Sequence, residues 1–322
     1  MQKLKGIKII HICKYLFLFF FLLSYIFSRL DTQILWIDLF DQLSFQILIG
    51  GILLTIIFLT FQKFLIATVY GLVCILLAFQ ILIPCNNCRA FIDDNLQSTK
   101  KIRLMTFNTS YSYYDSNDFD KIVELILKKE IDIIILQEVS TQFQKKLINL
   151  EKFFHYNVNL NKSIGFRDNI ILSKYPLIDS PVKKNDYIMV NCLLDGTELT
   201  IIAIHLYPPI SQAFFNSRLK TIAELKELIK NNKNNIILAG DLNMTPVSKR
   251  FTNFLEETNL YTFTSFIKPT FTWPTFLPSI LGIQIDHVLF SEKLKMIKKQ
   301  TINHFDSDHR PLLVDLYFDN KD

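Results

Sequence analysis

The stretch Asn-Ile-Ile-Leu-Ala-Gly-Asp-Leu-Asn, residues 235–243, joins a short apolar run to a polar ending. Apolar runs of about four to eight residues are typical of strands buried on both faces of a sheet. Turns after strands favour Gly, Pro, Asn or Asp, and they do not require Glu or His. The same pattern recurs at Ile102–Phe107 with Asn108, Ile131–Leu136 with Gln137 and Glu138, Leu199–Ile204 with His205, Ile283–Ile285 with Asp286 and His287, and Asp308 and His309 before Pro311–Phe318. The repetition predicts that several strand ends converge on one cleft.

Helical patterns alternate with these runs. Phe119–Lys129 and Ser211–Asn231 both place apolar residues at helical spacing. Strands that alternate with helices predict a layered α/β domain. The part of the chain that follows the linker at about residue 100 holds about 220 residues, which is enough to bury its own core.

Seven short motifs follow one another in order from about residue 101 to residue 318. They are Thr106-Phe107-Asn108, Leu136-Gln137-Glu138, Asn169–Pro176, Ile204-His205-Leu206, Gly240-Asp241-Leu242-Asn243, Ile285-Asp286-His287 and Ser307–Leu312. In this order they resemble the endonuclease/exonuclease/phosphatase superfamily, also called DNase I-like, in a membrane-anchored, bacterial-type member. The resemblance implies a four-layer α/β sandwich of two β-sheets flanked by helices. It also implies hydrolysis of phosphodiesters or phosphomonoesters with a divalent metal.

A hard cation is expected at the strand ends, because phosphate-ester hydrolysis brings a nucleophile to an anion. Mg²⁺ prefers oxygen ligands, and Glu138 offers a suitable carboxylate. The resemblance implies the same role for Glu138, supported by Asn108 and Asp308. We therefore expect Mg²⁺ as the cofactor, with Mn²⁺ as a possible substitute.

Five residues are predicted to act on the phosphate. His309 is the candidate general base or an electrostatic partner of the phosphate, and Asp286 is its expected carboxylate partner. Adjacent residues of an extended chain point to opposite sides, so the neighbouring Asp308 is the poorer partner. Asp241 is expected to orient the water and Asn243 to donate its amide. His205 would donate to a phosphate oxygen or protonate the leaving oxygen, and the sequence leaves the choice of base between Asp241 and His309 open.

Substrate-binding roles are expected for Asn169, Arg218 and Trp273. Asn169 matches a position at the edge of the site in the superfamily. Arg218 is placed to steer an anionic substrate, with an ordinary surface role as the alternative. Trp273 lies in a probable loop, where it would stack on a base, contact a lipid headgroup or pack in the core. The chain departs from the superfamily pattern at Ser110, Asp168 and Gln284, where members often carry Asn, Gly and Arg.

The first 94 residues are interpreted as a membrane module. Three apolar stretches of about 20 residues, near 9–28, 42–61 and 64–83, have the length that an α-helix needs to cross a bilayer. The catalytic domain is then expected over residues 95–322. By the positive-inside rule, the lysines before the first stretch and Lys63 face the cytoplasm, which predicts an extracytoplasmic catalytic domain in the inner or plasma membrane. A cytoplasmic catalytic domain is the alternative.

Charge and cysteine usage limit the partners. The formal net charge is only +5, and no basic run marks a nucleic-acid track. Nucleic acid, a phospholipid headgroup or a small phosphorylated molecule thus stay open as substrates, with the lipid bilayer as a partner and no obligate protein partner. Cys85 and Cys88 follow the third apolar stretch and form either a local disulfide or two thiols.

The sequence leaves three functions. The leading one is a metal-dependent phosphodiesterase or nuclease-like hydrolase. The second is a phosphomonoesterase or a sphingomyelinase-like hydrolase of phospholipid headgroups. The third is a degenerate, membrane-tethered binding module, which the complete set of motifs argues against.

Overall fold

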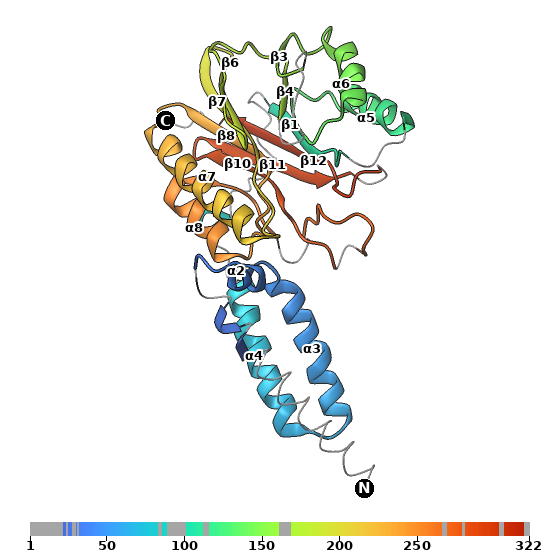
Figure 1. The fold of residues 1–322 in the computed structure, drawn as a ribbon, viewed down its shortest axis with the longest axis vertical. Coiled ribbons are helices and arrows are strands. Elements are labelled where there is room, and N and C mark those ends of the chain that lie inside the picture. Colours follow the sequence, from blue (N-terminus) through green and yellow to red (C-terminus); the bar gives the residue numbers. More distant parts are fainter. Residues whose placement is uncertain are drawn as a thin grey trace. The chain divides into compact units, whose positions relative to one another are not determined.

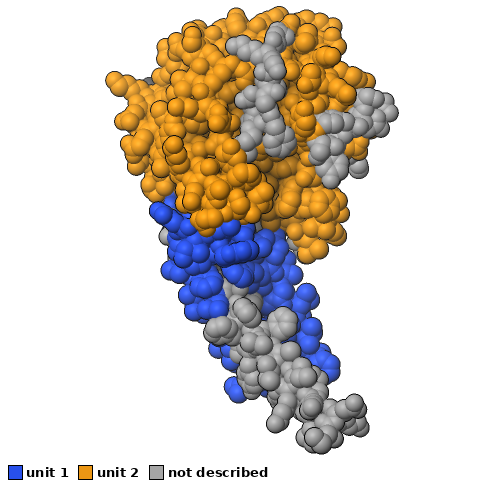
Figure 2. Space-filling view, viewed as in Figure 1, with its two compact units in different colours: residues 1–84, 245–253 blue, residues 85–244, 254–322 orange. Residues whose placement is uncertain are grey.

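The structure is a computed structural model of the 322-residue chain. It describes residues 22–23, 25–27, 30, 32–82, 86–88, 101–111, 116–160, 169–265, 269–278, 281–302 and 306–318. The chain divides into two compact units (Figure 2). One comprises residues 1–84 with 245–253, and the other comprises residues 85–244 with 254–322.

The first unit contains the apolar helices. They are α2 (Leu35–Gln42), α3 (Ser44–Thr60) and α4 (Phe64–Leu82). Among the described residues, α4 is long and apolar enough to cross a membrane, and α2 with α3, bent by 66°, could form a second span. The predicted stretch 9–28 falls mostly outside the described residues, which include only 22–23 and 25–27 of it. The prediction of three transmembrane helices is therefore not confirmed.

Local sequence does not show the partners of the acidic residues that precede α3. Asp38 and Asp41 are buried in α2. Within this unit the Asp41 carboxylate accepts a hydrogen bond from the backbone N–H of Lys249 at 2.6 Å, and Asp38 accepts one from Arg250 Nε at 2.8 Å. The reason is that these partners lie more than 200 residues further along the chain, where local sequence gives no sign of them.

The second unit is built on two mixed sheets of six strands each (Figure 1). One has the order β11-β12-β1-β2-β4-β3, and the other has the order β5-β6-β7-β8-β10-β9. The strands of the first sheet are β1 (Lys101–Asn108), β2 (Ile133–Gln137), β3 (Tyr156–Val158), β4 (Ile170–Ser173), β11 (Leu294–Thr301) and β12 (Leu312–Phe318). Those of the second are β5 (Val182–Lys183), β6 (Tyr187–Leu194), β7 (Thr197–His205), β8 (Asn235–Asp241), β9 (Leu260–Tyr261) and β10 (Asp286–Ser291).

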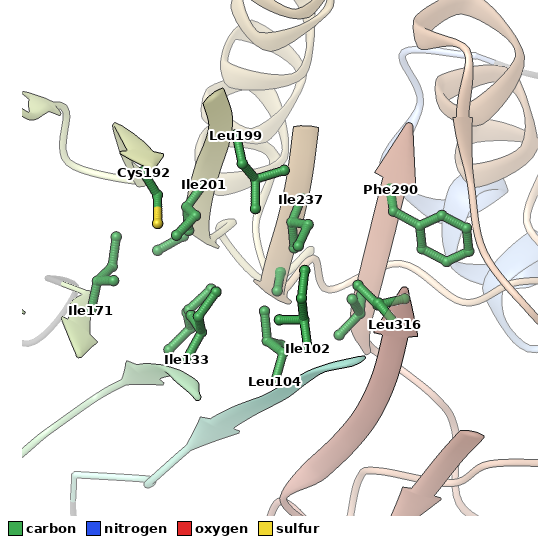
Figure 3. Close-up of a cluster of buried hydrophobic side chains, with 14 of the residues drawn as sticks. Ile102, Leu104, Ile133, Ile171, Cys192, Leu199, Ile201, Ile237, Phe290 and Leu316 are labelled. Atoms are coloured by element: carbon green, nitrogen blue, oxygen red, sulfur yellow. The ribbon is translucent and has the colours of Figure 1, made fainter. Parts of the chain in front are cut away.

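The two sheets bury a common apolar core. Ile102, Leu104 and Ile133 of the first sheet meet Ile201 and Ile237 of the second, and all are fully buried (Figure 3). A second cluster packs α5 (Ser116–Lys128) and α6 (Thr141–Leu147), through side chains such as Phe119 and Phe143, against the first sheet. The second sheet is covered by α7 (Gln212–Asn231), whose Ser211 cap accepts the backbone N–H of Phe214. The α/β prediction is confirmed, with two sheets flanked by helices.

Three further helical segments are described. They are η1 (Asn86–Cys88), η2 (Ile148–Leu150) and α8 (Lys249–Thr258). In η1 the buried Asn87 donates its side-chain amide to the carbonyls of Leu255 and Leu260. Cys88 is disulfide-bonded, and Cys85 lies outside the described residues.

One predicted strand was wrong. Ile283–Ile285 forms only an isolated bridge, between Ile283 and Trp273, and the strand begins at Asp286 itself. Because β10 runs antiparallel to β8, its first residue pairs with the last residue of β8, Asp241. Asp286 therefore lies at the same end of the sheet as the other predicted site residues, although it begins a strand and they follow strand ends.

Candidate active site

The predicted site residues gather at one end of both sheets. The parallel strands β1 and β2 end at Asn108 and Gln137, and the parallel strands β7 and β8 end at His205 and Asp241. The register pairs His205 with Asp241 and Asn108 with Gln137. Strand β10 then contributes its first residue to the same end. The carboxyl ends of parallel strands thus bring together side chains from both halves of the domain.

Gly240 permits the close approach of β7 and β8 at this point. Its φ is +145°, and a Cβ there would lie 1.9 Å from the Ile204 carbonyl oxygen. Such contact is impossible for a side chain, so the residue before Asp241 must be glycine. The motif Gly240-Asp241 is therefore fixed by the backbone as well as by chemistry.

Two further site residues hold a left-handed backbone. Glu138 has φ +52° and Asn243 has φ +49°. Non-glycine residues in this region cost about 1 kcal/mol or more, and they cluster at functional sites. Asn tolerates the conformation well, whereas Glu does not. The backbone strain at Glu138 indicates that the direction of its side chain is important for the site.

His309 and Asp286 form a buried pair. The His309 Nδ1–H donates to Asp286 Oδ2 at 2.9 Å, and Asp286 is fully buried. His309 Nε2 faces Asp241 Oδ2 at 3.9 Å and Asp308 Oδ1 at 4.0 Å. Burial acts to lower the pKa of His309, but these three carboxylates outweigh it and raise the pKa to about 10. The predicted Asp286–His309 partnership is present, in a protonated form.

Asp241 connects this pair to the other half of the site. Its carboxylate accepts the backbone N–H of Asn243 at 2.9 Å and the side-chain amide of Asn108 at 3.1 Å. Burial and the neighbouring Asp286 raise the pKa of Asp241 to about 7. A carboxyl group with such a pKa can exchange a proton near neutral pH.

Glu138 is linked to Asp241 through the side-chain amide of Asn108. Its Oε1 accepts Asn108 Nδ2 at 3.2 Å and lies 3.4 Å from His205 Nε2, and its Oε2 accepts the backbone N–H of Tyr111 at 3.3 Å. Burial raises the pKa of Glu138, although Asn108 and His309 act in the opposite direction. Glu138, Asn108 and His205 therefore form one contact group with Asp241.

Buried oxygen atoms without hydrogen-bond partners suit a cation at this end of the sheets. Among the described residues, Asp286 Oδ1 and Asp308 Oδ1 are buried and have no such partner. Asp241, Asp286 and His309 also place one ligand atom each within 4.8 Å of one another. Carboxylate oxygens are the donors that Mg²⁺ prefers. The donor set thus fits a hard divalent cation.

The residues near the site differ in what they offer a cation. His309 could bind a cation only through a deprotonated Nε2, whereas Glu138 and Asp308 offer carboxylate oxygens whatever the charge of His309. Asn108 turns its amide nitrogen toward Glu138, and its oxygen accepts the N–H of Ser110. Asn108 could therefore coordinate a cation only after its amide turns over.

The expected role of Arg218 in steering substrate was wrong. Arg218 is fully buried, and its Nη1 donates to the Asn243 carbonyl at 2.6 Å. Its guanidinium also lies 5.1 Å from the centre of the Phe215 ring. Arg218 therefore stabilises the left-handed backbone conformation of Asn243 through this hydrogen bond.

Trp273 and Asn169 are placed at the site in different ways. The indole N–H of Trp273 donates to Asp308 Oδ2 at 2.9 Å, which positions that carboxylate. Asn169 is fully buried next to β4, and neither polar atom of its side chain has a hydrogen-bond partner among the described residues. The register of β4 on β2 places Asn169 at the Gln137 end of that strand. Its amide is therefore a buried polar group at this edge whose hydrogen-bonding capacity is unused among the described residues.

Other supporting residues escaped sequence reasoning. Ser307 Oγ accepts the His309 N–H at 3.0 Å and donates to the Asn108 carbonyl at 2.8 Å, which ties the segment before β12 to the end of β1. His287 contacts the Met244 carbonyl through Nε2 at 2.8 Å, and Gln284 Nε2 lies 3.1 Å from its Nδ1. Burial lowers the pKa of His287 to about 3, so its ring is neutral. Ser307 belongs to a quoted motif, but its contacts are decided by tertiary structure.

Residues 105–309 match the model of the Endonuclease/Exonuclease/phosphatase family. The chain belongs to this family. Its members are generally hydrolases of phosphoesters. No curated protein sequence matches the chain.

Solved structures show the same fold at low identity. The human Nocturnin catalytic domain with bound sulfate is 18% identical, with a TM-score of 0.54 over 68% of this chain and 95% of that chain. TDP2 from D. rerio with a single-stranded DNA product is 13% identical, with a TM-score of 0.54 over 67% and 99%. A beta toxin variant from Staphylococcus aureus with bound magnesium ions is 18% identical, with a TM-score of 0.50 over 68% and 100%.

Proposed function

We propose that the protein is a membrane-anchored, Mg²⁺-dependent phosphodiesterase whose catalytic domain lies on the extracytoplasmic side. The observation that carries the proposal is the convergence of the Asp286–His309 pair, Asp241 and Glu138 at one end of both sheets. The structure with bound magnesium among the similar proteins supports the choice of metal.

Glu138 and Asp308 would hold the Mg²⁺. The ion supplies positive charge that neutralises the phosphate and the negative charge developing on it. The residues of the chain supply the rest. His309, as an imidazolium held by Asp286, faces the phosphate oxygens, and Asn169 donates its buried amide to one of them.

Hydrolysis forms a bond from a water oxygen to phosphorus and breaks the bond to the leaving oxygen, so one proton must be removed and one supplied. Nε2 of His309 lies near the Asp241 and Asp308 carboxylates, which favour its protonated form, so it is a poor acceptor of the water proton. Asp241 is then the acceptor. Asn243 orients the Asp241 carboxylate through its backbone N–H. His205, whose Nε2 lies 3.9 Å from Asp241 Oδ2, supplies the proton to the leaving oxygen.

Anchoring and sidedness are supported by separate observations. Helix α4 has the length and apolarity of a membrane span. Lysines precede the first apolar stretch and Lys63 separates α3 from α4, which favours a cytoplasmic position for both. The disulfide at Cys88 favours an oxidising compartment for the residues after α4.

The test uses the full chain in detergent with bis-p-nitrophenyl phosphate, the monoester p-nitrophenyl phosphate and single-stranded DNA. We expect Mg²⁺-dependent turnover of diesters, and EDTA should abolish it. Asp241→Asn should lower kcat by about 100-fold or more, because the general base is lost. Asp195→Asn, in the exposed turn after β6, is the matched control with unchanged kcat. Faster hydrolysis of the monoester would favour a phosphomonoesterase. A folded protein that turns over none of the three would refute the proposal and favour a binding module.

A further inference from the structure

Loops that leave the site end of the second unit form its rim. Segments 109–111 and 206–211 follow β1 and β7, whose last residues lie in the site. Segment 271–278 precedes β10 and is fixed to the site at Thr275, which donates its N–H to the Asp308 carbonyl at 2.9 Å and its hydroxyl to the Ser307 carbonyl at 2.8 Å. Tyr111 is fixed similarly through Glu138. The positions of these loops therefore follow the positions of the catalytic side chains.

The tips of these loops are apolar and exposed. Ile210 is 74% exposed, Phe276 is 71% exposed, and Tyr111 and Leu277 are also exposed. Single exposed apolar residues are ordinary, but several on the loops around one site indicate an interaction surface. We call Tyr111, Ile210, Phe276 and Leu277 the apolar rim.

The composition of the rim argues against a nucleic-acid partner. Proteins that follow a phosphate backbone use Lys and Arg around the site. In the described segments 109–111, 206–211 and 271–278 there is neither Lys nor Arg. An aromatic and aliphatic rim without cations instead fits the boundary between headgroups and acyl chains of a bilayer.

The bilayer that would meet the rim is the membrane that the chain's own apolar helix could span. Helix α4 could span a membrane, and side chains such as Leu65 and Phe79 are exposed along it. A tethered domain meets the tethering surface at a high effective concentration, so weak apolar contacts suffice to dock it. No separate partner is needed to cover the rim.

We propose that the apolar rim docks on the bilayer surface, and that the substrate is the phosphodiester of a lipid headgroup. This inference rests on the proposed function, because it uses the same site and the same hydrolysis. Water replaces one ester oxygen on phosphorus, and the leaving oxygen departs with a proton. The rim determines only which diesters reach the site.

The first test uses the full chain in nanodiscs of phosphatidylcholine, phosphatidylglycerol and sphingomyelin with Mg²⁺. Headgroup release is compared with hydrolysis of soluble bis-p-nitrophenyl phosphate. Phe276→Asp and Ile210→Asp should lower headgroup release at least 10-fold and leave soluble turnover within twofold of wild type. The matched control is Phe153→Asp, which is 41% exposed and follows η2. It precedes β3, whose Tyr156 pairs with the end of β4 that is remote from the site.

The outcomes separate the two proposals. A wild type that cleaves the soluble diester but no disc lipid overturns the rim proposal and leaves the proposed function standing. Rim variants that release headgroups at the wild-type rate overturn the rim proposal as well. Cleavage of single-stranded DNA that is faster than headgroup release, and that the rim variants retain, also overturns it. A wild type that cleaves neither lipid nor soluble diester removes the proposed function itself.

A second measurement does not depend on turnover. Phe276→Trp and Phe153→Trp each add one indole to the full chain, and their emission is measured in discs with and without brominated acyl chains. Docking predicts that bromine quenches the added emission of Phe276→Trp and spares that of Phe153→Trp. Equal quenching of the two variants would contradict docking through the rim.

Discussion

The Asp286–His309 pair gives the sharpest test of the site. Asp286→Asn keeps the shape of the side chain and removes its charge. The hydrogen bond that it weakens is 2.9 Å long and fully buried. Hydrogen bonds to charged groups contribute about 1.5–3 kcal/mol. If His309 must be held as an imidazolium when the phosphate is attacked, that energy is lost from the transition state.

The magnitude follows directly. A loss of about 1.5–3 kcal/mol corresponds to a fall of about 10- to 150-fold in kcat, since about 1.36 kcal/mol is tenfold in rate. Stability should fall as well, because the buried His309 loses its charged partner in Asp286→Asn. Breaking a buried ion pair by removing one partner costs about 3–5 kcal/mol.

The assay measures kcat for bis-p-nitrophenyl phosphate and the melting temperature of the same preparations. Wild type, Asp286→Asn, His309→Gln and the double variant form one cycle, with Asp195→Asn as the surface control. Residues that act as a unit are strongly non-additive, so the double variant should be about as slow as His309→Gln alone. A fall in kcat of less than threefold in Asp286→Asn, with an unchanged fold, would refute the reasoning.

Three further outcomes are expected. Burial acts to raise the pKa of Asp315, but its charged partner Arg103, at 2.7 Å, outweighs burial and lowers it, so Asp315→Asn should cost about 3 kcal/mol of unfolding free energy. That difference should be constant above the unfolded pKa near 4 and vanish as pH falls through the lowered folded pKa, measured by urea unfolding between about pH 7 and pH 2. Arg218→Met should lower kcat by about 10-fold without raising KM, because the Asn243 carbonyl loses a charged donor worth about 1.5–3 kcal/mol; a raised KM with normal kcat would return Arg218 to substrate binding. Mg²⁺ should raise the melting temperature of wild type by mass action and leave Glu138→Gln unchanged, and an equal rise in both would exclude Glu138 as a ligand.

Much of the site could be predicted before any tertiary contact was known. The apolar runs before Asn108, His205 and Asp241 are buried strands, as expected for short runs rich in Ile and Leu that end in turn residues or polar residues. Polar residues at such positions are costly unless they are used. Asp286 was assigned to the correct place for an incorrect reason, since it begins a strand rather than ending one.

Other roles could not be read from local sequence. Arg218 and Trp273 looked like exposed substrate contacts, because nothing near them in the chain is charged and complementary. Their partners, the Asn243 carbonyl and the Asp308 carboxylate, lie 25 and 35 residues away. A residue's role as support or as contact depends on which side of the loop its side chain reaches.

The sequence by itself determined the α/β class, the family motifs, the apolar N-terminal segment and the residue types of the site. These properties are local, since burial, turn chemistry and apolar length are written in consecutive residues. Only the tertiary structure decided that Arg218 donates to the Asn243 carbonyl, that Ser307 joins the segment before β12 to the end of β1, and that the apolar residues of the rim are exposed. Those contacts depend on strand pairing across distant segments, which fixes which side chains meet and which remain in water.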